Sequence, residues 1–351
     1  MSTAIESNTK LFHKYAEAAY LPTTQLSSTL GRLGCDQRRS FATSIADGGI
    51  QGYVARSERD IIISFAGTAS PSLEQFLRFV ANWAVNLNVK QLQHPSVTFN
   101  GERFRISGSV HAGFVNTLSS NLMNTVGRAI HNVAPPRGAR YWLTGHSLGG
   151  AMSNLIALPL AKRYPIAGVY TFGAPRVGDE EYADAYPHEH VRVESVADII
   201  PTLPTTPAAL EAVASLLHRI TAALEGLSSY VLSQKAQDLL RAIFRQLNAW
   251  AGNLSYKQPY KHSGTLYFLD ESGDHIHQSQ IDGEEPDSFE EFFGGLVQYL
   301  AGTALVSSGR RWIERLVEAA EGLEQSNAEF LKKWRADHDL VSYGRLLQLS
   351  A

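Results

Sequence analysis

The chain has 351 residues, of which 44% are hydrophobic and 19% charged, so it is long enough to bury a large core and too apolar to stay unfolded. Its formal net charge of −3 gives no sign of a basic surface for nucleic acid or for acidic membranes. Cys35 is the only cysteine, which excludes an intrachain disulfide and predicts a small buried residue at that position.

The N-terminal residues carry no recognisable targeting signal. Met1 to Asn8 contain no basic stretch followed by an apolar run, so we predict no Sec-type signal peptide. No stretch of about 18 consecutive apolar residues occurs, so we expect no transmembrane span. Together with the absence of disulfides, this predicts a protein that is cytoplasmic or exported without a cleaved leader.

The residues that follow Ala69 have the pattern of an amphipathic helix. Ser70 can cap its start, and Pro71 suits its first position. Phe79 and Trp83 lie beside a row of apolar residues at helical spacing, which consists of Leu73, Phe76, Leu77, Val80, Ala84 and Leu87. An ordinary helix fixed in the core would show the same spacing of apolar residues.

The most informative motif is Thr144-Gly145-His146-Ser147-Leu148-Gly149-Gly150, which follows the apolar residues 141–143. It contains G-x-S-x-G, the nucleophile elbow, in which a sharp strand-to-helix turn lifts a serine hydroxyl above a sheet. The glycines on either side of Ser147 are expected because a side chain there would strike the neighbouring strand or helix. The first N–H groups of the following helix would face the reacting centre, and we expect that helix to end before Pro159 or at the Tyr164–Pro165 step.

A serine nucleophile needs a histidine to take its proton and a carboxylate to orient that histidine. On α/β-hydrolase frameworks the order along the chain is serine, acid, histidine. Residues 191–198 alternate like a strand and end at Asp198, just before Ile199-Ile200-Pro201. Asp179 and Asp184 lie in a polar stretch with no strand directly before them, so we interpret them as solvated loop or first-turn helix charges.

The proton acceptor must be sought among five later histidines, which are His218, His262, His275, His277 and His338. His218 lies in a helical repeat, and His275 and His277 lie in a polar turn. His262 precedes a predicted strand at 265–269, and His338 lies in a loop after a long helical stretch. The residue pattern therefore leaves His262 and His338 as candidates and does not choose between them.

Two stretches on the C-terminal side interrupt the pattern of alternating strands and helices. At about 207–256, Thr206 and Pro207 can start a helix whose leucines, isoleucine and valine recur at spacings of three and four. At about 285–336, phenylalanines and leucines again line one face of predicted helices. We interpret both stretches as helical cap insertions in a single domain over 1–351; by default they enlarge the core, and otherwise they line an acyl channel or bind a protein partner.

Five blocks in this sequence resemble the class 3 lipase family, the fungal triacylglycerol lipase-like group that includes plant phospholipases and feruloyl esterases. They span about 55–205 and occur in the order of the family. The blocks are Ile61-Ile62-Ile63-Ser64-Phe65-Ala66-Gly67-Thr68, Val110-His111-Ala112-Gly113-Phe114, the elbow, Tyr170-Thr171-Phe172-Gly173-Ala174-Pro175-Arg176-Val177-Gly178-Asp179, and Asp198-Ile199-Ile200-Pro201.

The resemblance implies an α/β-hydrolase fold, with a mostly parallel central sheet flanked by helices and with the helical insertions on its C-terminal side. It also implies that His338 is the catalytic histidine and that His262 belongs to a structural turn. The oxyanion donors would be Thr68 and the backbone N–H of Leu148. Ala66 departs from the arginine that many members carry before the oxyanion glycine. We expect His146 and His111 to satisfy loop hydrogen bonds near the site.

In this family the segment after the oxyanion residue is a lid, so the resemblance implies a lid at about 69–89. Its apolar residues Leu73, Phe76, Leu77, Val80 and Trp83 would then contact the acyl chain or a lipid surface.

The expected activity is hydrolysis of lipid esters by Ser147, Asp198 and His338, at a lipid–water interface. The expected alternatives are a phospholipase A1, an esterase for soluble esters, and a non-catalytic scaffold that binds a protein partner. We expect no cofactor and no metal, because the histidines show neither H-x-x-x-H nor cysteine-paired spacing.

Overall fold

A computed structural model describes residues 3–43, 50–67, 91–118, 120–195, 198, 200–204, 259–269, 275–276 and 338–349. The expected lid at about 69–89 and the helical insertions at about 207–256 and 285–336 lie outside these residues. Among the described residues, no helix is long and apolar enough to cross a membrane.

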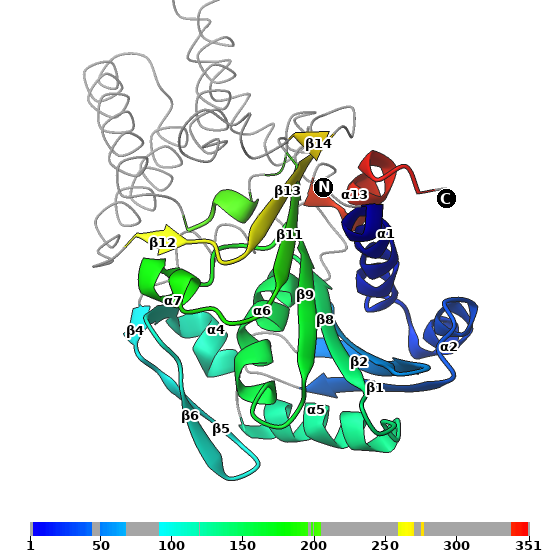
Figure 1. Ribbon diagram of the computed structural model, residues 1–351, viewed down its shortest axis with the longest axis horizontal. Helices are drawn as coiled ribbons and strands as arrows, with labels where there is room; N and C mark the ends of the chain where they lie inside the picture. The colour runs from blue at the N-terminus through cyan, green and yellow to red at the C-terminus, as the bar shows by residue number, and fades with distance from the viewer. Residues whose placement is uncertain are drawn as a thin grey trace, which may run out of the picture.

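A central sheet organises the described part of the chain (Figure 1). Its strands, in spatial order, are β1 (Gln37–Thr43), β2 (Ile50–Ser57), β3 (Asp60–Phe65), β8 (Arg140–His146), β9 (Ile166–Phe172), β11 (His190–Ser195), β13 (Thr265–Leu269) and β14 (His275–Ile276). The strands from β3 to β13 are parallel, whereas β1, β2 and β14 pair antiparallel with their neighbours. His275, which the sequence placed in a turn, thus begins a short edge strand.

Helices cover both faces of this sheet. On one face lie α4 (Ala112–Thr117), α5 (Ser120–Asn132) and α6 (Leu148–Leu160), and on the other lie α1 (Thr3–Ala18), α2 (Thr23–Arg32) and α13 (Leu340–Leu346). The pleat of β3 explains why both layers form, since Ile61 and Ile63 join the core under α5 and α6 while Ile62 joins the core under α1. The mostly parallel sheet flanked by helices is the fold that the sequence predicted.

Two smaller sheets and two short helices complete the described structure. The smaller sheets are β12 (Tyr260–Lys261), β10 (Gly178–Asp179), β7 (Ser109–His111) and β4 (Gln91–Gln93), and the hairpin β5 (Ser96–Phe99) and β6 (Glu102–Arg105). The short helices are α7 (Glu180–Asp184) and the 3₁₀ turn η2 (Ile200–Thr202).

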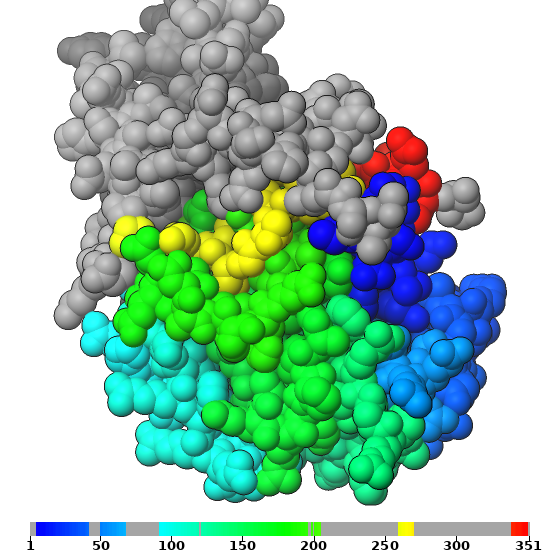
Figure 2. Space-filling view, in the orientation of Figure 1, coloured from blue at the N-terminus to red at the C-terminus, as the bar shows by residue number. Residues whose placement is uncertain are grey.

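The two ends of the described chain lie together. Figure 2 shows the N-terminal segment, in blue, beside the C-terminal helix α13, in red. Along α1 the residues Thr9, Phe12, His13 and Ala16 are buried, with the i, i+3, i+4, i+7 spacing of a helix face. This arrangement brings α1 against the segment that begins at His338.

The helix after the elbow differs from the expectation in its end point. It runs from Leu148 to Leu160 and includes Pro159, whereas the sequence predicted an end before Pro159 or at Tyr164–Pro165. A proline costs one backbone hydrogen bond, and in the last turn of a helix that loss is small enough for the helix to continue by one residue. Cys35 is a buried free cysteine, as expected.

Candidate active site

The elbow lies at the carboxyl end of β8, where Ser147 joins that strand to α6. Ser147 adopts φ 56° and ψ −130°, a conformation that costs a residue with a side chain free energy and marks functional turns. A Cβ on Gly145 would lie 2.4 Å from the backbone of Gly149, and a Cβ on Gly149 would lie 2.2 Å from the carbonyl oxygen of Phe65. Helix and strand are thus as close as the G-x-S-x-G motif predicted.

Three side chains from distant parts of the chain meet at this turn. His338 Nε2 lies 2.9 Å from Ser147 Oγ, and His338 Nδ1 lies 2.9 Å from both carboxylate oxygens of Asp198. Because a carboxylate only accepts, His338 Nδ1 carries the proton and Nε2 is left to accept from the serine hydroxyl. Ser147, Asp198 and His338 are 4%, 1% and 4% exposed, so water competes little for these bonds.

Asp198 is held on both of its oxygens. The backbone N–H of Ile200 donates to Oδ1 at 2.9 Å, and the hydroxyl of Tyr343 donates to Oδ2 at 2.7 Å. The Tyr343 hydroxyl in turn accepts from the N–H of Ser195, the last residue of β11, at 3.3 Å. Tyr343 on α13 therefore ties the end of the acid's strand to the acid, a role that sequence reasoning had not assigned to it.

A second chain of hydrogen bonds surrounds the site. The N–H of Gly67 donates to the hydroxyl of Tyr20 at 2.8 Å, and that hydroxyl lies 2.8 Å from His146 Nδ1. His146 Nε2 lies 2.7 Å from the backbone oxygen of His338. Burial holds the pKa of His146 well below its usual value, so this imidazole is neutral. The expected loop hydrogen bonds of His146 are thus present, and Tyr20 is a partner that no sequence motif indicated.

The expected oxyanion donors are only partly within the described residues. Leu148 is the first residue of α6, where backbone N–H groups have no acceptor inside the helix. Thr68 lies outside the described residues, as do Leu73, Phe76, Leu77, Val80 and Trp83. Ala66, which stands where many family members carry an arginine, follows β3 and is buried. Gly67 is partly exposed next to the elbow.

His262, the other candidate base, lies away from Ser147. Its Nε2 contacts the backbone oxygen of Pro201 at 2.7 Å and the Glu194 carboxylate at 3.5 Å. Burial and the charges of Arg192 and Arg176 hold its pKa well below the usual value. This neutral histidine supports the loop that carries Asp198. His111 is similar in kind, since its Nδ1 accepts from the N–H of Gly113 at the start of α4.

The two competing aspartates do not approach the elbow. Asp179 caps α7 by accepting from the N–H of Tyr182 at 3.0 Å, so its interpretation as a charge at the start of a helix is confirmed, whereas its expected solvation is wrong because it is 5% exposed. It is buried because β10 pairs with β7 and β12 on its two sides. Asp184 is exposed and pairs with Lys261 at 3.3 Å, as expected of a solvated charge.

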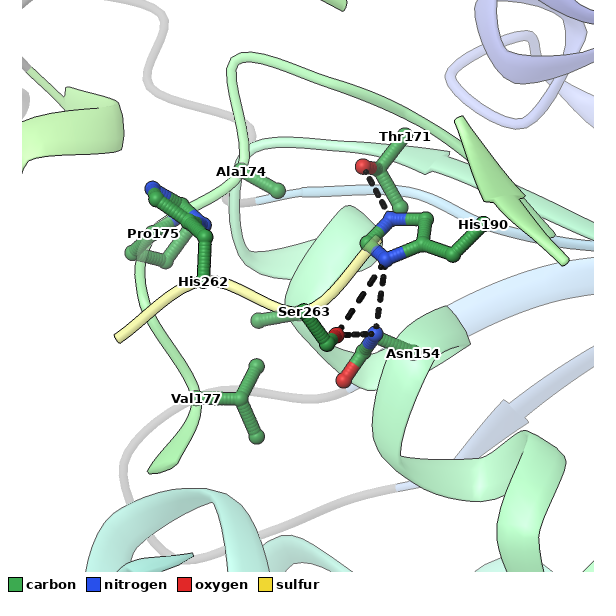
Figure 3. Close-up of a pocket in the computed structure, with 9 residues that line it drawn as sticks. Asn154, Thr171, Ala174, Pro175, Val177, His190, His262 and Ser263 are labelled. Carbon is green, nitrogen blue, oxygen red and sulfur yellow. Dashed lines mark hydrogen bonds between the residues drawn. The ribbon is translucent and has the colours of Figure 1, made fainter. Parts of the chain in front are cut away.

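A second buried polar cluster lies between α6 and the strands β9 and β11 (Figure 3). His190 Nε2 lies 2.9 Å from Thr171 Oγ1, and its Nδ1 lies 3.1 Å from Asn154 Nδ2 and 3.3 Å from Ser263 Oγ. Burial, aided by Arg192, lowers the pKa of His190 to about 3. The cavity beside this cluster measures about 10 Å³, which is room for a single water molecule.

No group of three or more histidine, cysteine, aspartate or glutamate side chains within the described ranges is arranged to hold a metal ion.

The sheet order, the strained elbow and the hydrogen-bonded row of Ser147, His338 and Asp198 define an α/β-hydrolase fold. Residues 62–208 match the family model for lipase (class 3), which confirms the resemblance to that family seen in the sequence motifs.

Two curated relatives also match part of the chain. The chain is 30% identical to secreted mono- and diacylglycerol lipase 1 of Fusarium solani, over 44% of this chain and 43% of that protein. It is 29% identical to a lipase of Rhizomucor miehei, over 47% of this chain and 43% of that protein. The chain thus spans less than half the length of these relatives. A triacylglycerol lipase structure from Penicillium expansum aligns with a TM-score of 0.46 and 16% identity, over 77% of this chain and 81% of that chain.

Proposed function

We propose that this protein is a serine hydrolase that cleaves the carboxylic ester bonds of lipids through an acyl-enzyme intermediate. The observation that carries the proposal is the row of hydrogen bonds from Ser147 Oγ through His338 to Asp198, each 2.9 Å long. This row lies at the carboxyl end of the parallel strands, where α/β folds bind their ligands.

The geometry supports the following chemistry. Ser147 Oγ attacks the ester carbonyl carbon while its proton passes to His338 Nε2. Asp198 keeps the proton of His338 on Nδ1 and stabilises the imidazolium that forms. His338 then gives the proton to the leaving alcohol as the carbonyl–oxygen bond breaks. A water molecule, deprotonated by the same histidine, hydrolyses the acyl-serine and releases the carboxylic acid.

The developing oxyanion needs preorganised donors. Leu148 supplies a backbone N–H at the start of α6, and the proposal assigns the second donor to Thr68, directly after Gly67. An N–H group at this position is worth roughly 3 kcal/mol to the transition state of such a reaction.

The lipid class is the finer part of the proposal. The curated relatives from Fusarium solani and Rhizomucor miehei are named as lipases, which supports acylglycerols as substrates. The amphipathic spacing at about 69–89, after Gly67, supports a lid that opens at a lipid–water interface. The Fusarium relative is named as secreted, which supports export of this protein, and activity in the culture medium of a producing strain would test that point.

The test compares initial rates on p-nitrophenyl butyrate, emulsified triacylglycerol and phosphatidylcholine vesicles, with the Ser147→Ala variant beside each. Acylglycerol hydrolysis that rises steeply above the solubility limit, and is lost in the variant, is the expected result. Serine-dependent release of fatty acid mainly from the vesicles would replace the acylglycerol assignment with a phospholipase A1. Activity on the soluble ester alone would contradict the proposed lid that opens at an interface. If none of the three substrates is hydrolysed in a Ser147-dependent way, the proposal that this protein is a serine hydrolase is wrong.

A further inference from the structure

The segment just after α1 enters the candidate active site through a single side chain. Tyr20 lies two residues beyond the end of α1 and outside the region 62–208 that matches the lipase family model. Its hydroxyl lies 2.8 Å from two atoms on different segments, the backbone nitrogen of Gly67, after β3, and the Nδ1 of His146, the last residue of β8. Gly67 adjoins the expected oxyanion residue, and His146 adjoins Ser147.

The direction of each hydrogen bond in this chain follows from its chemistry. The oxygen of His338 is a backbone carbonyl and can only accept, so His146 Nε2 must carry a proton and donate to it. The neutral imidazole then has a lone pair on Nδ1. The amide of Gly67 can only donate, so Tyr20 accepts from Gly67 and directs its own proton to His146 Nδ1.

The carbonyl of His338 therefore fixes the tautomer of His146, and Tyr20 supplies the donor that this tautomer needs on Nδ1. The His146 ring is held at both nitrogens, by the hydroxyl of Tyr20 on one side and by the carbonyl of His338 on the other. Without that hydroxyl, the buried Nδ1 loses its donor, and only the bond to the carbonyl of His338 holds the ring.

Helix α1 itself holds the backbone around His338 at a second point. His13 Nε2 lies 2.7 Å from the backbone oxygen of Leu340, to which it must donate, and the His13 ring packs against Phe172. The carbonyls of residues 338 and 340 are thus both held by buried imidazoles. His13 acts directly from α1, whereas His146 binds the carbonyl of the proposed base and is itself held at Nδ1 by Tyr20.

We propose that Tyr20 is a positioning residue of the active site, whose hydroxyl holds the His146 ring at Nδ1 and thereby fixes the backbone of His338 relative to Ser147. The proposal rests on the function proposed above, because it concerns the placement of His338 for proton transfer. A small displacement of a proton acceptor lowers kcat more than it changes substrate binding.

The kinetic test compares Tyr20→Phe with Tyr53→Phe. Tyr53 is a matched control, since its buried hydroxyl donates to the backbone oxygen of Tyr15 on α1 at 2.7 Å and touches no active-site group. We expect Tyr20→Phe to lower kcat about tenfold, equivalent to about 1.4 kcal/mol, with KM within about twofold. Tyr53→Phe should keep kcat within about twofold of the unaltered protein. Equal kcat values in the two variants would overturn the proposal.

A double-mutant comparison tests whether Tyr20 acts through His146. In His146→Gln, the amide can still donate to the carbonyl of His338 but offers no Nδ1 to Tyr20. Adding Tyr20→Phe to this variant should therefore lose most of its tenfold effect. If the full loss persists in the His146→Gln background, Tyr20 does not act through His146, and the proposal is wrong.

A spectroscopic readout separates this proposal from the proposed activity. Long-range ¹⁵N–¹H spectra of histidine-labelled protein report which ring nitrogen carries the proton, and the signal absent from His146→Gln assigns His146. The unaltered protein should show His146 neutral and protonated on Nε2. Tyr20→Phe should keep that tautomer and change the ¹⁵N chemical shift of Nδ1, which loses its hydrogen-bond donor. Protonation on Nδ1 in the unaltered protein, or an unchanged Nδ1 shift in Tyr20→Phe, would overturn the proposal. The result stands whether or not the protein hydrolyses any ester.

Discussion

Two buried histidines in the described structure each lie within hydrogen-bonding distance of a serine hydroxyl, His338 beside Ser147 and His190 beside Ser263. They differ in what the other ring nitrogen meets. His338 Nδ1 faces the carboxylate of Asp198, whereas His190 Nε2 faces the hydroxyl of Thr171. A proton arriving on His338 is therefore stabilised by a negative charge, and one arriving on His190 is not.

The backbones of the two serines differ as well. Ser147 adopts a positive φ of 56° at the turn into α6, and the first N–H groups of a helix have no acceptor inside it. Ser263 precedes β13 and accepts a hydrogen bond from the Asn154 amide at 2.9 Å. A serine–histidine contact alone thus does not make a nucleophile, because a carboxylate and oxyanion donors must also be placed around it.

The two serine–histidine pairs, Ser147 with His338 and Ser263 with His190, should differ most in their effect on activity. Ser147→Ala should lower kcat for ester hydrolysis by a factor on the order of 10⁴ or more, since the acyl acceptor is lost. Ser263→Ala should leave kcat within about twofold and cost about 1 kcal/mol of stability through one lost hydrogen bond. Initial rates and urea unfolding of both variants measure these effects, and a large loss of kcat in Ser263→Ala would break the comparison.

Removing the charge that distinguishes the pairs should have the next largest effect. Asp198→Asn would present an amide to His338 Nδ1, favour the wrong tautomer and leave the imidazolium unstabilised, so kcat should fall by about 10³ to 10⁴. KM should change much less. Steady-state kinetics on a soluble ester test this, and a variant retaining more than about a tenth of kcat would show that Asp198 is not the orienting acid.

The hydroxyl of Tyr343, which donates to Asp198, should contribute less to kcat than Asp198 itself. Tyr343→Phe removes the 2.7 Å hydrogen bond to Asp198 Oδ2 but leaves the bond from Ile200 to Oδ1. We expect kcat to fall about fivefold to tenfold and the melting temperature to drop by a few degrees, about the effect of one buried hydrogen bond. Kinetics together with thermal unfolding separate the two losses. An unchanged kcat with a lowered melting temperature would make Tyr343 purely structural.

The last prediction concerns the pH dependence of stability. His190 has its pKa lowered to about 3 in the folded protein, against an ordinary unfolded value of about 6.5. Above pH 6.5 both states leave it neutral, and as the pH falls below 6.5 only the unfolded state takes up the proton. Its contribution to stability is therefore full above about pH 6.5 and declines toward pH 3.

Replacing His190 isolates this contribution. Between pH 6 and pH 4, the free energy of unfolding of the unaltered protein should fall more steeply than that of His190→Gln, by about 1.4 kcal/mol per pH unit. Urea unfolding at several pH values measures both slopes, and parallel slopes would mean that His190 is protonated equally in both states.

Local sequence patterns were sufficient to predict part of the candidate site. The elbow motif indicated Ser147 because its glycines are required by a close approach of helix and strand, and the alternating strand at 191–195 led to Asp198. The choice between His262 and His338 needed the family resemblance, since His338 lies 140 residues beyond Asp198. Periodicity and spacing carry no information about contacts made after such a long intervening stretch.

The supporting tyrosines were beyond sequence reasoning for a related reason. Tyr20 reaches His146 across 126 residues, and Tyr343 reaches Asp198 across 145 residues. Each is a single hydroxyl on an otherwise apolar helix face or turn, where tyrosine is common as a core residue. The fold could be predicted because the elbow and the blocks around it resemble those of a known α/β-hydrolase family, whereas these bonds arise only when the N-terminal and C-terminal segments pack against the sheet.

The most direct test of the central claim is to map the serine that reacts with a fluorophosphonate, a reagent that modifies activated serine hydroxyls. Mass spectrometry of the labelled protein should find one adduct, on the peptide that contains Ser147, and the labelling rate should fall strongly in Asp198→Asn. An adduct on a different serine, or no labelling of the folded protein, would contradict the assignment of Ser147, His338 and Asp198 as the catalytic groups.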